Sequence, residues 1–258
     1  MNVTFIAHSA FLVEWDKFYT LFDYTYEPDY TGALPELSGD KPLLVFSSHS
    51  HEDHFDAKVF ALLEKYPGAR FFVSRDTRLT ERKRQWLNIS DAAFARTTVL
   101  RPDSILLTEV AGEDLSIRAV KSTDIGNAYL LRCEGKMVYH GGDLNWWDWK
   151  SEGEAYCNNM AAHYRTAIEK LASAVENEAT DNAIAPEITA AMAPLDPRLG
   201  EGSEGLGIEE LMRQIRVQHV FPMHMWKKYE VIDRYIAAHP AQKDAIARIT
   251  REGETFTI

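Results

Sequence analysis

The sequence predicts an α/β protein built in layers, with two sheets or half-domains packed together. Short runs of apolar, β-branched and aromatic residues with polar interruptions recur along the chain, as is typical of half-buried strands. Three further runs, at 43–46, 188–195 and 219–223, are predominantly apolar, which suits strands buried on both faces. Helical patterns separate these runs. Strands followed by a helix, and then by more strands and helices, indicate layers around a hydrophobic core.

The first part of the chain is expected to form strands before its first helix. These strands are predicted at 3–7, 10–15, 18–24 and 43–46, with a loop rich in proline and glycine at 28–42. A helix follows from about Asp56 and ends before Pro67, because Pro67 and Gly68 interrupt its apolar pattern. A strand at 70–74 and a polar helix at 76–86 complete this part.

Strands predominate in the middle of the chain, at 105–109, 115–120, 127–132 and 136–140. Residues 155–177 carry apolar side chains every three or four positions, which predicts a helix whose stripe packs into the core. The remaining elements are expected as strands at 188–195, 219–223 and 255–258, and helices at 208–217 and 231–239. Because no repeat or linker divides the chain, a single domain is predicted over residues 1–258.

Composition and charge exclude several classes of protein. With 258 residues, 45% hydrophobic and 26% charged, the chain matches ordinary globular proteins and not disordered, collagenous or coiled-coil ones. Its net charge of −11 repels phosphate backbones and anionic membrane surfaces, so bulk nucleic acid is not an expected partner. No secretory signal or membrane-spanning stretch is evident. Cys133 and Cys157 are too few for a disulfide framework, so reduced thiols and a cytoplasmic location are expected.

Three of the nine histidines lie within six residues, in the segment His49-x-His51-x-Asp53-His54. The segment follows the buried strand at 43–46, and α/β proteins place their sites at such strand ends. In an extended loop, side chains two positions apart lie on the same side, so His49 and His51 can bind one divalent ion. Asp53 and His54 project toward a second position. The segment therefore predicts half of a metal site.

A metal site needs more ligands than one loop supplies, and two other strand ends offer them. Asp143 follows the strand at 136–140 and the pair Gly141-Gly142, which lets the backbone approach an ion closely. His224 follows the strand at 219–223 in the same way. We expect both side chains to complete the site.

With these residues the sequence resembles the metallo-β-lactamase-fold hydrolases. The resemblance rests on the motif from His49 to His54, then Gly142-Asp143, then the late His224, in this order. Residues 6–13 and 139–143 look most like the branch that includes ascorbate-phosphate lactonase-like proteins and relatives of N-acyl-phosphatidylethanolamine phospholipase D. The resemblance implies a four-layer αββα sandwich with its metal site at one edge of the two sheets.

The resemblance also implies a role for each ligand. His49 and His51 would bind the first metal, Asp53, His54 and His224 the second, and Asp143 would bridge the two. The family normally supplies a third histidine to the first metal, and the matching stretch at 121–127 contains none. Ser122 lies near the expected place, and Asp124 is the nearby side chain that could replace the histidine. This stretch leaves three possibilities for the first metal site. The site binds its ion weakly, a carboxylate completes it, or it stays empty.

Together with these ligands, the resemblance implies a metal-dependent hydrolase. A divalent ion can lower the pKa of bound water to about 7 and polarise a carbonyl or phosphoryl oxygen. Asp53, the expected catalytic residue, would orient that water and accept its proton. Zinc is the expected metal, in one or two copies, although manganese and iron suit the same ligands. The predicted substrate is a small molecule, anionic or not, with an ester, lactone, amide or phosphodiester bond. Two alternatives stay open: a phosphodiesterase or nuclease, and a metal-binding sensor or scaffold.

Residues outside the motif are candidates for the pocket. His8 is a candidate for hydrogen bonding to the substrate. Arg198 would either grip an anionic substrate or form a structural ion pair. Trp146, Trp147 and Trp149, directly after Asp143, would either wall an apolar pocket or anchor the helix that follows.

Overall fold

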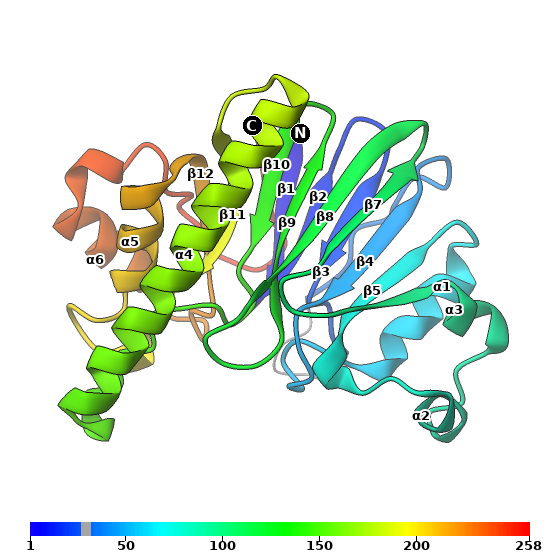
Figure 1. Cartoon of the computed structure of the whole chain (residues 1–258), viewed down its shortest axis with the longest axis horizontal. Coiled ribbons are helices and arrows are strands. Elements are labelled where there is room, and N and C mark those ends of the chain that lie inside the picture. Colours follow the sequence, from blue (N-terminus) through cyan, green and yellow to red (C-terminus); the bar gives the residue numbers. More distant parts are fainter. Residues whose placement is uncertain (27–31) are drawn as a thin grey trace.

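Two β-sheets lie face to face between two layers of helices in the computed structural model of the chain, which describes residues 1–26 and 32–258 (Figure 1). Helices α1, α2 and α3 lie on one side of the sheets, and α4, α5 and α6 lie on the other. The predicted αββα sandwich is therefore confirmed. Part of the loop predicted at 28–42 lies outside the described residues, and residues 32–42 form neither helix nor strand.

The first sheet contains seven strands in the order β13-β1-β2-β3-β4-β5-β6. Their bounds are β1 Asn2–Ala7, β2 Ala10–Glu14, β3 Tyr19–Phe22, β4 Leu43–Ser47, β5 Arg70–Ser74, β6 Thr97–Leu100 and β13 Glu254–Thr257. Strands β13, β1, β2 and β3 pair antiparallel, whereas β3, β4, β5 and β6 run parallel. The parallel strands end together at one edge of the sheet, where the histidine motif begins.

The second sheet contains six strands in the order β12-β11-β10-β9-β8-β7. Their bounds are β7 Ile105–Val110, β8 Glu113–Lys121, β9 Asn127–Cys133, β10 Lys136–His140, β11 Glu187–Pro194 and β12 Arg216–Met223. Strands β10, β11 and β12 are parallel, so the residues that follow them are carried to one edge. Asp143, Asp196 and His224 lie just beyond these three strands.

The α-helices are α1 Phe60–Lys65, α2 Glu81–Trp86, α3 Asp91–Ala95, α4 Glu154–Asn182, α5 Leu206–Gln214 and α6 Glu230–Ala238. The apolar stripe predicted in α4 is buried, and its side chains include Tyr164, Ile168 and Leu171. None of the described helices is both long and apolar enough to cross a membrane. Both cysteines are free, Cys133 buried and Cys157 half-buried.

Two predicted helices have the wrong bounds. The helix expected at 76–86 begins only at Glu81, where the Thr80 hydroxyl accepts a hydrogen bond from the Lys83 amide and caps the first turn. Arg78, with φ of 49°, adopts the left-handed conformation and separates this helix from the preceding short turn. The helix expected at 208–217 ends at Gln214, because the chain enters strand β12 at Arg216.

Helix α3 and strand β6 were not predicted. Helix α3 spans only five residues and buries Ala93 alone, so it shows almost no apolar period. In strand β6, two of the four residues are exposed and only Leu100 is buried. Short elements with one buried side chain leave little signal in a sequence, since periodicity needs several turns or pleats.

A single cluster of buried side chains fills the space between the sheets and extends to α4. It includes Phe11 and Phe46 from the first sheet, Tyr129 and Val138 from the second, and Ile168 from α4. The rings of Phe46 and Tyr129 are 5.3 Å apart, and the Tyr129 hydroxyl donates to the carbonyl of Ser47, at 2.9 Å. The end of β4 is therefore held by packing and by a hydrogen bond, directly before the histidine motif.

Candidate metal centre

The histidine motif forms a tight loop directly after β4. The amides of His54 and Phe55 both donate to the carbonyl of His51, at 3.0 and 2.8 Å, which folds the segment back on itself. The side chains of His49 and His54 are completely buried, whereas half of the His51 side chain is exposed. The loop thus directs its imidazoles into the edge of the sandwich, as the motif predicted.

One set of potential ligands, here called the first group, comprises His49, His51, Asp124 and Asp143, which all have a ligand atom within 4.8 Å of the others. His49 Nε2 lies 3.0 Å from His51 Nδ1 and 3.4 Å from Asp143 Oδ2. Asp124 Oδ2 lies 3.7 Å from His51 Nδ1. Two imidazoles and two carboxylates at such spacing can surround one divalent ion.

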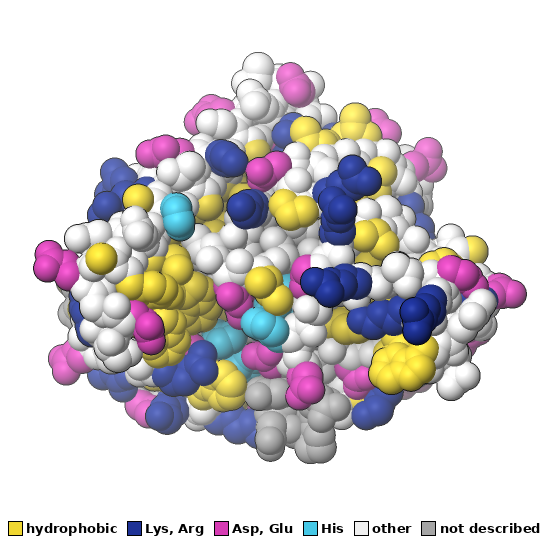
Figure 2. All heavy atoms as spheres, turned by 60° about the horizontal axis from the view of Figure 1, so that its bottom comes forward, with side chains coloured by type: hydrophobic (Ala, Val, Ile, Leu, Met, Phe, Trp, Pro, Cys, Tyr) yellow, Lys and Arg dark blue, Asp and Glu magenta, His cyan; other side chains and the backbone are white. Residues whose placement is uncertain are grey.

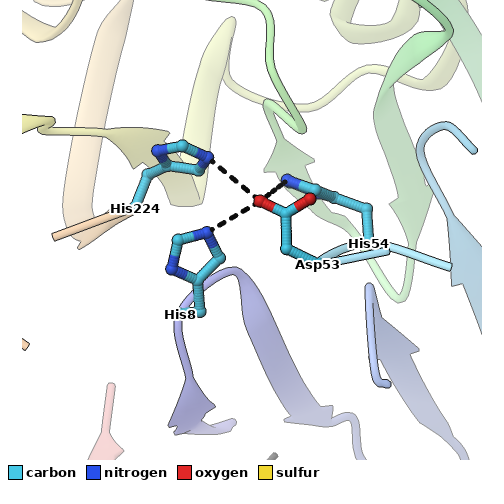
Figure 3. Close-up of side chains that lie close together, drawn as sticks. All are labelled: His8, Asp53, His54 and His224. Atoms are coloured by element: carbon cyan, nitrogen blue, oxygen red, sulfur yellow. Dashed lines mark hydrogen bonds and ion pairs between the residues drawn. The ribbon is translucent and has the colours of Figure 1, made fainter. Parts of the chain in front are cut away.

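The second group comprises His8, Asp53, His54 and His224, and it meets the same criterion (Figure 3). The side chains converge on Asp53 Oδ2, which lies 3.2 Å from His8 Nε2, 3.5 Å from His54 Nε2 and 3.6 Å from His224 Nε2. Three of these residues were predicted as ligands of the second metal. His8 was only a candidate for hydrogen bonding to the substrate, and the structure places it among the potential ligands.

Asp143 lies between the two groups. Its Oδ2 faces His49 Nε2 of the first group, whereas its Oδ1 lies 3.2 Å from His54 Nε2 and 3.5 Å from His224 Nε2 of the second. The two oxygens of one carboxylate thus point to different sets of histidines. This is the geometry that a bridging ligand needs.

Three buried atoms at this centre have no hydrogen-bond partner in the described parts of the chain. They are His54 Nε2, His224 Nε2 and Asp143 Oδ1. A buried polar atom without a partner costs about 1–3 kcal/mol, so three in one place call for a ligand. Imidazole nitrogen and carboxylate oxygen are common ligands of zinc, manganese and iron. The side chains present therefore fit one or two divalent ions.

The outer nitrogens of the histidines are held by carboxylates that the sequence analysis did not single out. His54 Nδ1 donates to Asp23 Oδ2 at 2.6 Å, and His224 Nδ1 donates to Asp196 Oδ2 at 2.8 Å. Such bonds fix each ring so that Nε2 is left to face an ion. Both aspartates lie at strand ends, Asp23 after β3 and Asp196 after β11, and this position was the available signal.

Burial and charge act against each other at this centre. Burial alone would favour the neutral form of every group, but the carboxylates of Asp143 and Asp23 raise the pKa of His54 above its ordinary value. Burial would also lower the pKa of His224, but Asp143 and Asp196 raise it to about 9. Burial would raise the pKa of Asp143, and the histidines lower it instead. The carboxylates therefore stay ionised, as metal ligands must be.

Replacing Asp23 with asparagine is expected to weaken metal binding about 10- to 100-fold. The amide cannot accept a charge-assisted bond from His54, and it also weakens the bonds from the Ser48 amide and hydroxyl, both at 2.7 Å. Competition with a coloured chelator measures the affinity. The exposed Asp244 provides the matched control, and Asp244→Asn should bind metal as the wild type does. Equal affinity in Asp23→Asn would show that the ring of His54 needs no such support.

The stretch without the expected histidine contributes Asp124 and not Ser122. Ser122 is buried, and its hydroxyl oxygen accepts a hydrogen bond of 3.2 Å from the backbone amide of Asp124. Gly126 lets this loop lie directly on the motif: its φ is +73°, and a Cβ there would come within 2.4 Å of His49 Cβ. Of the alternatives left by the sequence, the geometry favours a first site completed by a carboxylate.

A cavity of about 650 Å³ opens above both groups. Arg198 lines this cavity. Of its two predicted roles, the structure shows the ion pair: Arg198 Nε lies 3.0 Å from both carboxylate oxygens of Asp196. Trp147 lines the cavity too, and its Nε1 donates to the carbonyl of Asp143 at 2.9 Å. Trp146 packs under the guanidinium of Arg165 instead, 4.4 Å from the ring centre, and is not part of the lining.

Known proteins share both the sequence pattern and the fold. The beta-lactamase superfamily domain matches residues 2–148. A UPF0173 metal-dependent hydrolase from Korarchaeum cryptofilum is 28% identical over 166 residues, which span 62% of this chain and 68% of that protein.

Two solved structures are similar over the whole chain. A metallo hydrolase from Ignicoccus hospitalis has a TM-score of 0.56 and 19% identity, with 100% of this chain and 98% of that one covered. A possible metal-dependent hydrolase from Veillonella parvula has a TM-score of 0.57 and 13% identity, with 100% and 99% covered. The resemblance to a narrower branch stays a prediction. The chain therefore belongs to the beta-lactamase superfamily, and the prediction of a metal-dependent hydrolase with the metallo-β-lactamase fold is confirmed.

Proposed function

We propose that this hydrolase holds two divalent ions, most simply zinc, and uses them to cleave an ester, lactone, amide or phosphodiester bond of a small molecule. The observation that carries the proposal is the convergence of two ligand groups on Asp143, beneath a cavity of about 650 Å³. Cavities of roughly 300–1,000 Å³ are usual for small-molecule sites. The first ion would be held by His49, His51, Asp124 and Asp143, and the second by Asp143 with His8, Asp53, His54 and His224.

When bound, such ions lower the pKa of a coordinated water to about 7 and polarise the bond to be cleaved. The chain supplies the orientation. Asp53 lines the cavity and is partly exposed to it, so its carboxylate can accept a hydrogen bond from the attacking water. Burial would raise the pKa of Asp53, but the nearby imidazoles of His224, His54 and His8 lower it instead. Asp53 is therefore ionised near neutral pH, which is the form that can accept a hydrogen bond from water.

Hydrolysis is expected to be lost on chelation and restored by added zinc or manganese. A panel of lactones, carboxylic esters, amides and bis-aryl phosphates tests which bond is cleaved, with metal analysis on the same preparation. Recovery of activity in parallel with metal content supports the proposal. Full metal occupancy with every compound inert would count against a hydrolytic bond of these classes.

Replacing Asp124 with alanine is expected to reduce the metal content from about two ions per chain toward one, because the first group loses one of its two carboxylates. Elemental analysis after dialysis against limiting zinc measures this, and Asp244→Ala is the matched control. Unchanged content in Asp124→Ala would show that the two histidines and Asp143 suffice for the first ion.

We also infer that residues 1–258 form one domain, because one buried cluster contains side chains of both sheets and of α4. The cytoplasmic location stays a prediction from the sequence. A nuclease is a less suitable candidate than a small-molecule hydrolase, because four carboxylates line the cavity: Glu52, Asp53, Asp124 and Asp143.

A further inference from the structure

The cavity above the metal centre has two sides of different chemistry. One side carries the polar groups of the metal centre. The other carries large apolar side chains, Trp147, Trp149, Tyr156 and Met160, and Trp226 lies next to the metal centre, with its ring 4.7 Å from that of His8. Figure 2 shows hydrophobic side chains gathered in a broad patch beside the histidines. Apolar patches on a surface mark interaction sites, and ligand-binding grooves are among them. Because this patch lines the cavity above the metal centre, we interpret it as part of a ligand site.

The apolar side of the cavity, here called the apolar wall, consists of side chains that are held in place by packing and hydrogen bonds. The rings of Trp147 and Trp149 are parallel to within 2°, with centroids 6.1 Å apart. Trp147 is held by its hydrogen bond to the carbonyl of Asp143, so the wall is tied to the bridging ligand. Tyr156 and Met160 lie four residues apart in α4 and so point to the same side of the helix. The flat rings of Trp147, Trp149 and Tyr156 favour a flat ligand, and the flexible Met160 side chain can adapt to it.

Apart from histidines, the one cation in the described lining of this cavity is Arg198, and its charge is already offset. The guanidinium binds both oxygens of Asp196, a fully buried carboxylate. It also lies 4.3 Å above the ring of Trp226 and 5.5 Å from that of Trp149. Arg198 therefore extends the flat wall, whereas a site for a remote phosphate or carboxylate would need a cation free to pair with it.

We propose that the substrate carries an uncharged, flat apolar group, such as an aryl ring, beside the bond that is cleaved, and that Trp149 and Tyr156 bind this group. The inference rests on the proposed function, since it concerns the substrate of the same site. The site is then expected to prefer neutral esters, lactones or amides that carry an aryl ring over substrates that carry an anionic group away from the reacting bond. This differs from the anionic substrate that Arg198 suggested in the sequence, because Asp196 occupies that arginine.

Two esters with the same reacting bond test the proposal. Both are ethyl esters with the same two-carbon spacer. Ethyl 3-phenylpropanoate carries a phenyl ring at the far end, and monoethyl succinate carries a carboxylate there. The zinc-loaded protein is expected to cleave the phenyl ester with a kcat/KM at least about tenfold higher, as burial of one ring allows. Trp149→Ala and, independently, Tyr156→Ala should remove most of this preference. Trp86 is 77% exposed on α2 and outside the cavity, so Trp86→Ala is the matched control and should keep the preference.

A binding measurement separates this inference from the proposed function. The neutral fluorescent probe N-phenyl-1-naphthylamine is expected to bind the zinc-loaded protein, to be displaced by ethyl 3-phenylpropanoate, and to bind at least about fivefold more weakly to Trp149→Ala. If this holds while neither ester is cleaved, the apolar wall is supported and ester hydrolysis is rejected. If both esters are cleaved equally well, or if Trp149→Ala changes neither binding nor preference, the inference is overturned and the hydrolase function stands.

Discussion

Replacing Asp143 with alanine is expected to remove both metal ions and to lower kcat/KM by about a thousandfold or more, on the order of 4 kcal/mol of transition-state stabilisation. Among the described residues, Asp143 is the one side chain whose oxygens face His49 on one side and His54 and His224 on the other. The imidazoles of His54 and His224, whose pKa values are raised by Asp143, would also lose this neighbouring negative charge. They would then bind both protons and metal ions less tightly.

Metal content per chain and kcat/KM on the best substrate of the panel are the measurements. Asp143 contributes its backbone carbonyl to Trp147, and that bond survives the substitution, so the fold should persist. Near-ultraviolet circular dichroism checks this point. Retention of about two ions by Asp143→Ala would contradict the bridging role, whatever happened to the activity.

Asp53→Asn is expected to lower kcat by about 10²- to 10⁴-fold while the protein still takes up metal at saturating zinc. Asparagine keeps the volume of the side chain but cannot accept a proton from water. Three histidines of the second group remain, together with Asp143, so an ion can still be held there. The split between retained metal and lost turnover distinguishes Asp53 from Asp143.

Glu52 provides the control for this second substitution. It is the exposed neighbour of Asp53, it lines the same cavity, and it belongs to neither ligand group. Glu52→Gln removes one negative charge from the same wall and should change kcat only a few-fold, since no hydrogen bond or ion pair joins Glu52 to the ligands within the described parts of the chain. Comparable losses in both variants would assign the effect to the charge of the cavity and not to proton transfer by Asp53.

The strands and the ligand motif could be predicted because their signals are local. The apolar run before His49 and the histidine spacing both lie within a dozen residues, and the same holds for the strand that precedes Asp143. The supporting carboxylates could not be predicted with equal ease. Asp23 reaches His54 only because β3 and β4 are parallel neighbours, and pairing of strands is a property of the folded chain.

His8 and Asp124 illustrate the same limit. Each is a single polar residue in a turn, with no repeated spacing to mark it. His8 adopts the left-handed conformation, φ 47°, directly after β1, and this turn aims its ring at Asp53. Asp124 is placed by the close approach of Gly126 to His49. In both cases the sequence supplied candidates, and the decision among them depended on contacts between distant segments.

The ligands of the metal centre come from both sheets, and this has a consequence for stability. An ion in the second group would join His8 after β1 and His54 after β4 to His224 after β12, as a covalent cross-link between the sheets would. Because the unfolded chain cannot keep residues 8 and 224 together, the ion binds the folded state preferentially and raises the free energy of unfolding. A free ion concentration 100 times the dissociation constant contributes about 2.7 kcal/mol. Folding and metal binding are thus thermodynamically coupled, and removal of the ion would loosen the two sheets from each other at the edge that carries the candidate metal centre.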